Sequence, residues 1–183
     1  MSDGRTRCSW CGEEEIYVRY HDLEWGVPEH DDHALFELLT LEGAQAGLSW
    51  LTVLRRREGY RRAFEHFDPE IVAGFGDRRV AKILSDPEVV RHRLKIASVI
   101  TNARAVLHAQ REHGSFDSYV WQMVADKGDK VATAKAMSKR LSKGGFTFVG
   151  PTICLSFMQA SGMVNDHARE CFRFEEIEAL RTT

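Results

Sequence analysis

Candidate metal ligands lie at both ends of this chain of 183 residues, and they constrain the fold more than any other feature. Cys8, Cys11 and His21 lie near one end, and His167 and Cys171 lie near the other. The spacing of His167 and Cys171 places both side chains on one face of a helix. A closed structural zinc site needs four nitrogen or sulfur ligands in a tetrahedron. Two ligands from each end would therefore hold the two ends of the chain together.

The spacing leaves two ligand sets open. The C-x2-C pair favours Cys8, Cys11, His167 and Cys171, and the alternative is Cys8, His21, His167 and Cys171. A third interpretation is that these residues are reduced thiols and unconnected histidines. A structural metal is favoured over a catalytic one, because no open position for a substrate is evident. The first ten residues lack an apolar signal segment, so we expect a cytoplasmic protein, in which disulfides are rare.

Helix signals dominate the rest of the sequence. The expected helix starts are Asp31, Ser49, Asp68-Pro69, Asp86-Pro87, Ser115 or Asp117, Thr133 and Pro151, and the expected ends are Gly47, Gly114 and Gly144-Gly145. The helix after Ser49 is expected to extend over 50–67. Only residues 146–148 come close to the period-two alternation of a strand. The sequence therefore predicts an all-α fold with about nine short helices in one domain.

The longest run without a charged residue, 144–165, has the length of a membrane span. Its polar residues and internal glycines indicate a turn followed by a buried helix instead. We therefore expect no membrane partner.

Charge is unevenly distributed, although the net charge is only −2. Residues 1–49 carry 11 acidic and 3 basic side chains, whereas residues 50–113 carry 13 basic and 8 acidic ones. A local basic face can bind phosphates even when the whole protein is acidic. The alternative, which charge alone favours, is a solvated face with pairs along a helix, such as Arg61 with Glu65.

Aromatic side chains gather in the first 50 residues, which contain Trp10, Tyr17, Tyr20, Trp25 and Trp50. Aromatic residues most often belong to a core, but these lie among polar neighbours. Glu42 interrupts an apolar helical stretch, where a carboxylate is costly without a partner or a function. Aromatic faces attract cations, and a carboxylate orients them. The combination predicts a pocket for a flat cationic heterocycle.

Several long motifs are, in their order along the chain, similar to those of a known family. They are RCSW, YVRYHDLEWGVP, LFELLTLEGAQAGLSWLTVL, RREGYRRAF, FDPEIVA, RHRLKI and GFTFVGPTICLSFMQASGMVNDH. They resemble the 3-methyladenine DNA glycosylase I family over residues 7–171. The resemblance implies a helix-hairpin-helix DNA glycosylase fold, with one structural zinc that tethers the N- and C-terminal segments. We expect one domain over 1–183, with two helical lobes.

The resemblance also implies an activity. The expected enzyme is a monofunctional glycosylase of base excision repair, which flips N3-methyladenine out of alkylated double-stranded DNA and hydrolyses its N-glycosidic bond. We expect it to be a monomer that releases 3-methyladenine as product.

Carried over motif by motif, the resemblance assigns the site residues. The zinc ligands fall on Cys8, His21, His167 and Cys171. The base pocket falls on Trp10, Tyr17, Tyr20, Trp25, Glu42 and Trp50. Glu42 and Tyr20 take the catalytic role, because both hydrogen-bond the base edge, and Trp50 stacks on the base. DNA-backbone contacts are expected at Lys143, Gly150 and Thr152.

The segment GFTFVGPT resembles the hairpin of the wider superfamily. Its glycines allow close backbone approach, and N–H groups at the start of the next helix can hold a phosphate. Superfamily members with an additional lyase step carry Lys where this chain has Thr152, so we expect water as the nucleophile and no Schiff base. The usual catalytic Asp of the superfamily is expected to be missing, with Asp166 as the one remaining candidate. The chain departs from the pattern at Leu94, where relatives often have Gly, and at Pro151, which lacks an N–H.

Three other classes of protein fit part of the sequence. A zinc-clipped reader of modified nucleotides would share the pocket but release no base. A zinc hydrolase would use an open metal position with Asp166 or Glu42 as the base. An interaction protein would have these aromatic residues in its core only. Release of a base from alkylated DNA separates all three from a glycosylase.

Overall fold

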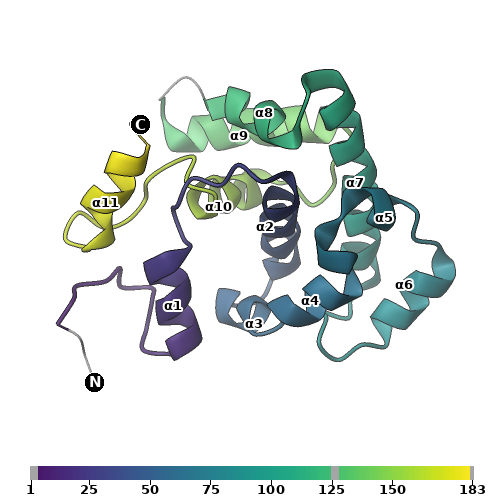
Figure 1. The fold of residues 1–183 in the computed structure, drawn as a ribbon, viewed down its shortest axis with the longest axis horizontal. Helices are drawn as coiled ribbons and strands as arrows, with labels where there is room; N and C mark the ends of the chain where they lie inside the picture. Colours follow the sequence, from purple (N-terminus) through teal and green to yellow (C-terminus); the bar gives the residue numbers. More distant parts are fainter. Residues whose placement is uncertain (1–3, 125–127, 182–183) are drawn as a thin grey trace. The chain divides into compact units, whose positions relative to one another are not determined.

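A computed structural model describes residues 4–124 and 128–181 of the chain (Figure 1). Every regular element in these residues is helical, which confirms the all-α prediction. The α-helices are α1 (Glu15–Leu23), α2 (Asp32–Gln45), α3 (Trp50–Leu54), α4 (Arg57–Ala63), α5 (Pro69–Ala73), α6 (Asp77–Leu84), α7 (Arg93–His113), α8 (Phe116–Trp121), α9 (Lys130–Lys143), α10 (Pro151–Ala160) and α11 (Arg173–Leu180). The 3-10 segments are η1 (Glu65–Phe67) and η2 (Gln122–Val124).

Side-chain caps begin most of the predicted helices. Asp31, Ser49, Asp68 and Ser115 each accept a hydrogen bond from a backbone N–H in the first turn of α2, α3, α5 and α8, respectively. Each cap satisfies an N–H that has no partner within the helix, which contributes about 1 kcal/mol. Gly114 ends α7 with φ +88°, in the left-handed region that glycine adopts without strain.

The predicted start of the long helix at Asp86-Pro87 is wrong, because α7 begins at Arg93 with His92 as its N-cap. The Asp86 carboxylate does accept the N–H of Glu88, but this turn does not continue into a helix. Val89 is buried, and the N–H of Val90 donates to the Tyr60 hydroxyl at 3.3 Å. Packing therefore holds this segment outside the helix, whatever its local preference.

The expected helix over 50–67 is also divided, into α3, α4 and η1. Glu65, His66 and Phe67 all have positive φ, between 48° and 60°, which is rare for residues with side chains. The break lets Phe67 pack against Phe36 and Phe64, with ring centroids 5.8 and 6.0 Å apart. Burial of these rings offsets the backbone strain.

Two smaller predictions also fail. Asp129, and not Thr133, caps α9, since its carboxylate accepts the N–H of Ala132 and starts the helix one turn earlier. Residues 146–148 form no strand, and Phe148 has φ +55°.

The chain contains two compact units. Unit 1 combines the residues up to Glu29 with those from Met158 onward, and unit 2 is the continuous segment His30–Phe157. The α10 helix begins in unit 2, and its last three residues belong to unit 1.

Unit 2 is organised around α7, the longest helix, which packs against α2, α5, α6 and α8 (Figure 1). Its largest completely buried side chains are Leu35, Phe36, Leu39, Leu41, Tyr60, Phe64, Phe67, Ile96, Phe116, Met137, Leu141 and Phe157. The carboxylate of Asp32 accepts the backbone N–H groups of Phe116 and Asp117 at 2.9 and 2.8 Å, and so joins the starts of α2 and α8.

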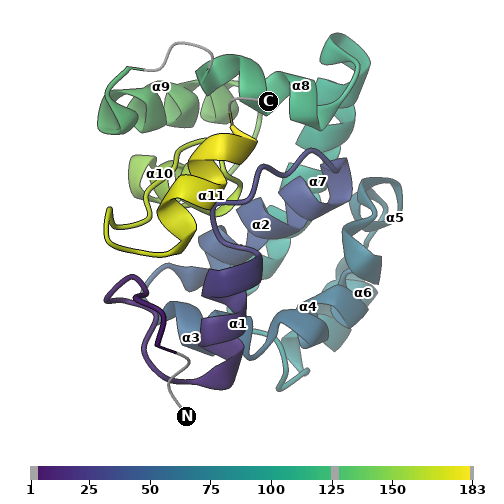
Figure 2. The same cartoon turned by 60° about the vertical axis from the view of Figure 1, so that its left-hand side comes forward.

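Unit 1 brings together the first and last segments of the described chain, purple and yellow in Figure 2. The N–H of Phe172 donates to the carbonyl of Thr6 at 3.0 Å. Gly162 has φ +73°, and a Cβ there would lie 2.5 Å from both the nitrogen of Pro28 and the carbonyl carbon of Val27. Such a distance leaves no room for a side chain, so two segments distant in sequence pack backbone to backbone at this glycine.

No helix in the described part of the chain is both long enough and apolar enough to cross a bilayer. The uncharged run at 144–165 instead contains the loop after α9, the helix α10 and the turn that follows it. Cys154 and Phe157 of α10 are completely buried.

Candidate functional site

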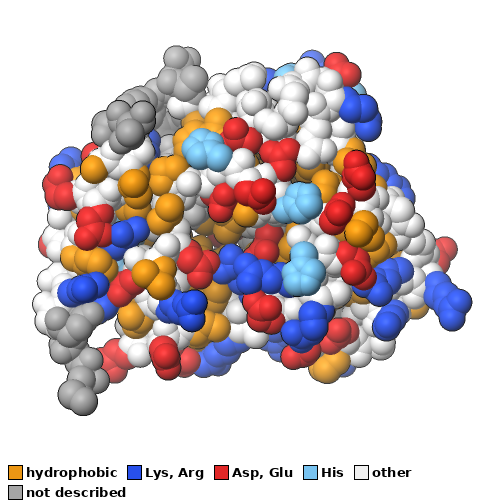
Figure 3. All heavy atoms as spheres, in the orientation of Figure 1, with side chains coloured by type: hydrophobic (Ala, Val, Ile, Leu, Met, Phe, Trp, Pro, Cys, Tyr) orange, Lys and Arg blue, Asp and Glu red, His pale blue; other side chains and the backbone are white. Residues whose placement is uncertain are grey.

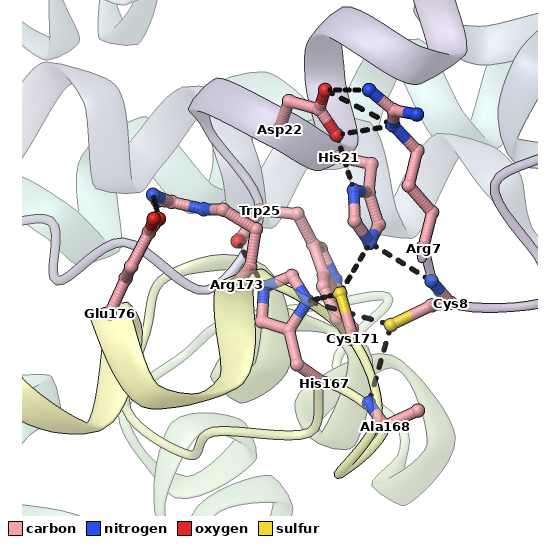
Figure 4. A network of polar contacts seen from close by, with 10 residues as sticks. All are labelled: Arg7, Cys8, His21, Asp22, Trp25, His167, Ala168, Cys171, Arg173 and Glu176. Atoms are coloured by element: carbon pink, nitrogen blue, oxygen red, sulfur yellow. Dashed lines mark hydrogen bonds and ion pairs between the residues drawn. The ribbon is translucent and has the colours of Figure 1, made fainter. Parts of the chain in front are cut away.

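Four of the candidate metal ligands come together within unit 1 (Figure 4). The ligand atoms of Cys8, His21, His167 and Cys171 all lie within 4.8 Å of one another, and all four residues are buried. Cys8 precedes α1, and His21 lies in the last turn of α1. His167 and Cys171 lie in the loop between α10 and α11, not on a helix as their spacing predicted. That loop is folded locally instead, since the Asn165 side chain accepts the N–H of His167.

The sulfur-to-nitrogen distances fit a tetrahedral zinc ion. Cys171 Sγ lies 3.4 Å from His21 Nε2 and 3.5 Å from His167 Nδ1, and Cys8 Sγ also lies 3.5 Å from His167 Nδ1. Zinc bonds of about 2.3 Å to sulfur and about 2.0–2.1 Å to nitrogen, at tetrahedral angles, separate the two ligand atoms by about 3.6 Å. The four residues could therefore hold such an ion with little rearrangement.

Hydrogen bonds fix which nitrogen of each imidazole faces the cluster. His167 Nε2 lies 3.0 Å from the carbonyl oxygen of Trp25, so it carries the proton and leaves Nδ1 with a lone pair. His21 Nδ1 lies 2.8 Å from the Asp22 carboxylate, and His21 Nε2 receives the N–H of Cys8 at 3.3 Å. Both nitrogens that face the sulfurs are thus acceptors, the state in which imidazole binds a metal.

An ion pair between Arg7 and Asp22 orients His21. Arg7 donates from Nε and Nη2 to both carboxylate oxygens of Asp22, at 2.9 and 2.7 Å (Figure 4). Desolvation favours the neutral form of Asp22, but its hydrogen bonds to Arg7 and His21 prevail and lower the pKa of the carboxyl. The ionised Asp22 accepts from His21 and raises the basicity of the imidazole toward a bound cation.

Burial sets the protonation of the ligands in the absence of a cation. It lowers the pKa of His21, lowers that of His167 to about 4 and raises that of the Cys8 thiol to about 11. The imidazoles are therefore neutral at pH 7, whereas the Cys8 thiol needs a cation to lose its proton. The N–H of Ala168 points at Cys8 Sγ from 3.3 Å and would stabilise the resulting thiolate.

Cys11 is buried but lies outside this cluster. Its N–H donates to the carbonyl oxygen of Cys8 at 3.0 Å in a tight turn. Of the two ligand sets that the spacing left open, the structure assembles the one that contains His21.

The aromatic residues of unit 1 pack against the ligand cluster. Trp10 lies 4.7 Å from Trp25, 5.2 Å from Tyr17 and 6.5 Å from Tyr20, measured between ring centroids. Trp25 also lies edge-on to His167 at 4.5 Å. Tyr20 is buried, whereas Trp10, Tyr17 and Trp25 keep part of their surface exposed. The four ligand residues and these aromatic residues therefore pack together within unit 1.

Glu42 and Trp50 belong to unit 2. Glu42 is only 5% exposed, on the last part of α2, and Trp50 is the first residue of α3. Burial raises the pKa of Glu42 to about 8. Among the described residues, no side chain or backbone group forms a hydrogen bond or ion pair with this carboxyl.

Glu42 instead lines a pocket of about 230 Å³. The other lining residues are Gln45, Ala46, Gly47, Leu48, Thr152, Ile153 and Ser156. A buried carboxyl with a raised pKa, facing a pocket, is the kind of group that marks a functional site. Thr152 of the predicted DNA-contact set therefore lies at the same pocket as Glu42.

The segment between α9 and α10 is held by Asn102, a buried side chain of α7. Asn102 donates to the carbonyl of Thr147 at 3.0 Å, and its own amide oxygen accepts the N–H of Thr147 at 2.8 Å. Lys143 lies where α9 ends and lines a different groove, of about 500 Å³, together with Arg140. Gly150 directly precedes α10, and a Cβ there would meet no atom within 4 Å.

Several basic residues of 50–113 form ion pairs within unit 2. The pair predicted between Arg61 and Glu65 does not form, because Arg61 binds Glu37 and Glu58, and Glu65 binds Arg79. Arg57 shares Glu37, and Arg62 binds Glu88. Acidic and basic side chains are interspersed on the right of Figure 3. This surface is therefore closer to the solvated face of the sequence analysis than to an uninterrupted phosphate-binding patch.

Asp166, the remaining candidate for a catalytic Asp, lies in unit 1 next to His167. Its carboxylate accepts a hydrogen bond from Gln159 within unit 1. Sequence reasoning missed the contacts of Arg7, Asp22 and Asn102. Only Asp22, the carboxylate directly after a ligand histidine, left a signal that could have been found.

The sequence is similar to one family of known proteins. The family model for methyladenine glycosylases matches residues 10–174. The chain is 45% identical to DNA-3-methyladenine glycosylase 1 of Escherichia coli (strain K12), over 90% of this chain and 95% of that protein.

Solved structures agree as well. A crystal structure of 3-methyladenine DNA glycosylase I has 46% sequence identity and a TM-score of 0.86, covering 91% of this chain and 98% of that one. A variant of 3-methyladenine DNA glycosylase I in complex with 3-methyladenine has 34% identity and a TM-score of 0.86, covering 92% and 97%. On the evidence of its sequence and of its all-helical fold, the chain belongs to the methyladenine glycosylase family.

Proposed function

We propose that this chain excises N3-methyladenine from alkylated double-stranded DNA, as a monofunctional glycosylase in which both units form one domain. The observation that carries the proposal is the buried carboxyl of Glu42, which lines a pocket and has no partner among the described residues. A group of this kind is costly to the fold and is retained where it serves a ligand.

The reaction requires the damaged nucleotide to leave the base stack, because no side chain reaches its glycosidic bond within a duplex. Methylation at N3 gives the base a positive charge. The base therefore departs with the electron pair of the broken N–C1′ bond and becomes neutral. Water adds to C1′ and loses a proton to solvent, which leaves an abasic sugar and free 3-methyladenine.

Glu42 distinguishes the damaged base from normal adenine by charge. With its pKa raised to about 8, the empty pocket holds mainly the neutral acid at pH 7. A cationic base favours the carboxylate, so binding and ionisation reinforce each other. Uncharged adenine does not favour ionisation of the carboxyl, and it also interacts less with aromatic faces.

The aromatic residues supply the remaining recognition. We assign base contacts to Trp10, Tyr17, Tyr20, Trp25 and Trp50, with Tyr20 hydrogen-bonding the base edge and Trp50 stacking on it. Each stacking or cation–π contact contributes about 1–3 kcal/mol. Because Trp10 and Trp25 pack on the ligand histidines, a zinc ion held by Cys8, His21, His167 and Cys171 would also hold these two side chains in place. The metal would act on structure alone.

The segment from α9 through α10 is proposed to act as a helix-hairpin-helix that binds the DNA backbone. The exposed Gly150 and the start of α10 present the backbone that would approach a phosphate. Thr152 stands where lyases of the superfamily carry Lys, so no Schiff base forms and water is the nucleophile.

The Asn102→Leu variant tests the hairpin. Losing the three hydrogen bonds to Thr147 leaves buried polar groups without partners, which costs about 1–3 kcal/mol and loosens the loop. We expect affinity for duplex DNA, measured by fluorescence anisotropy, to fall about tenfold for this loss, with binding of free 3-methyladenine unchanged. Thr101→Ala, a substitution at an exposed position on the same helix, serves as the control. Unchanged DNA affinity in a folded N102L protein would argue against a role of the hairpin.

Direct assay of base release tests the activity itself. Purified protein is incubated with methylated duplex DNA, and released bases are separated by chromatography. We expect 3-methyladenine to appear with enzyme turnover, and no uracil to appear from uracil-containing DNA. Binding without release would instead identify a reader of modified bases. Activity that a chelator abolishes before the fold is lost would identify a metal-dependent hydrolase.

A further inference from the structure

A lysine of unit 2 closes the end of the helix that carries Glu42. Lys95, in the first turn of α7, extends its ammonium group to the C-terminal end of α2. Its Nζ donates to the carbonyl oxygens of Ala44 and Ala46, at 2.9 and 2.6 Å. Carbonyls in the last turn of a helix have no partner within the helix. Lys95 therefore supplies from another helix the cap that α2 lacks in its own sequence.

The charge of Lys95 matters as much as its hydrogen bonds. The last turn of α2 contains no basic residue, and the helix dipole places about half a negative charge at that end. Glu42 lies in this same turn and must ionise against the dipole when it meets a cation. An ammonium group bound to the terminal carbonyls offsets the dipole where it opposes the carboxylate.

The cap also fixes one wall of the pocket. The residues from Gln45 to Leu48, which follow Glu42, line the same pocket. The chain turns sharply there, with Gly47 at φ +80° and no neighbouring atom within 4 Å of a Cβ built on it. The N–H of Leu48 donates to the carbonyl oxygen of Gln45 at 2.6 Å and closes the turn. The bond from Lys95 to the carbonyl of Ala46 holds the closed turn against α7.

We infer that Lys95 is a positioning residue for base excision, which acts through the carbonyls of Ala44 and Ala46 on the pocket wall and on the ionisation of Glu42. This inference deepens the proposed function and rests on it. Lys95 itself needs no contact with the base.

A second cation on α7 provides a matched control. Arg104 donates from Nε to the carbonyl of Ala73, the last residue of α5, at 3.0 Å. K95M removes the cationic cap that α7 provides at the end of α2, and R104M removes the one that it provides at the end of α5. Only the cap on α2 lies at the Glu42 pocket. Thermal unfolding of both variants measures the general cost of losing such a cap.

We expect K95M to lower kcat/KM for 3-methyladenine release at least tenfold, at a temperature where it is fully folded, and R104M to change it less than twofold. The pH at which kcat/KM rises to half its maximum should shift upward in K95M, because Glu42 loses the charge that favours its ionisation. K95R, which keeps the charge and donors, should recover part of the activity. Wild-type kcat/KM in K95M, or equal losses in K95M and R104M, would overturn the inference.

Amide hydrogen exchange tests the anchor independently of activity. The N–H groups of residues 46–48 should exchange at least tenfold faster in K95M than in the wild type, with exchange in α5 unchanged. Unchanged exchange at 46–48 would refute the anchor even if the variant were inactive. Absence of base release from the wild-type protein would instead refute the proposed function and leave the exchange result standing.

Discussion

The Glu42→Gln variant is expected to lose excision of 3-methyladenine by at least about a hundredfold, since it removes the charge that the cationic base meets in the pocket. Glutamine preserves the size of the side chain, and no described partner of the carboxyl is lost with it. The measurement is kcat/KM on methylated duplex DNA, with the exposed substitution E58Q as the control. A wild-type rate in E42Q would remove Glu42 from the mechanism.

The same variant is expected to be more stable than the wild type in alkaline solution. The folded-state pKa of Glu42, about 8, lies above the ordinary value of 4.5, so the folded protein holds this proton more tightly than the unfolded chain does. The stability from this proton is complete below pH 4.5 and is lost as the pH rises to about 8. The E42Q protein has no carboxyl to ionise, so its free energy of unfolding does not fall in this way. The difference amounts to a few kcal/mol, of the order of 1.4 kcal/mol for each pKa unit. Denaturant unfolding at pH 5 and pH 9 measures the difference between the two proteins.

The pH dependence of activity follows from the same group. Because kcat/KM reports on ionisations of the free enzyme, it should rise with pH toward a midpoint near 8 in the wild type and lose this dependence in E42Q. A flat profile in the wild type would mean that ionised Glu42 is not required.

Loss of the metal centre is the second large effect that we expect. Elemental analysis should find about one zinc per chain in the wild type, and Cys171→Ala should lose it. The variant then keeps three buried ligands without a cation, and the two segments of unit 1 remain joined by weaker contacts alone. We expect its unfolding temperature to fall by at least about 10 °C, since each kcal/mol shifts a protein of this size by about 2–4 °C.

Cys11→Ala is the matched control for that experiment, because Cys11 is equally buried and lies near the cluster without belonging to it. It should retain zinc. Zinc-replete C171A would reject the metal clip, and zinc-depleted C11A would favour the set that contains the C-x2-C pair. In the wild type, activity should fall together with unfolding when a chelator is added.

Local chemistry made much of the fold predictable. Asp31, Ser49 and Asp68 begin helices where the sequence indicates, because a cap acts on N–H groups two or three residues away. The start at Asp86 failed for the opposite reason. Buried Val89 and the hydroxyl of Tyr60, 30 residues from its partner Val90, decide the conformation there, and no local pattern encodes such a contact.

The candidate site was likewise predictable only in part. The Cys and His residues at the chain ends could be recognised, because zinc accepts few residue types and their side chains cluster as metal ligands do. The spacing alone could not choose between Cys11 and His21. The family resemblance indicated His21, and the fold brings His21 into the cluster. Lys95 and Asn102 bind backbone carbonyl and N–H groups, which every residue possesses. Their partners therefore leave no trace in the sequence.

The division of the chain into a continuous unit and a unit made from two segments has a consequence for its synthesis on the ribosome. His30–Phe157 is one continuous segment, so every residue of this unit is present once the segment has emerged. Cys8 and His21 emerge first but must wait for His167 and Cys171, which are made after the whole continuous unit. A metal centre formed by these four residues would therefore be completed last, and a nascent chain that stalls before Cys171 would lack one of its ligands.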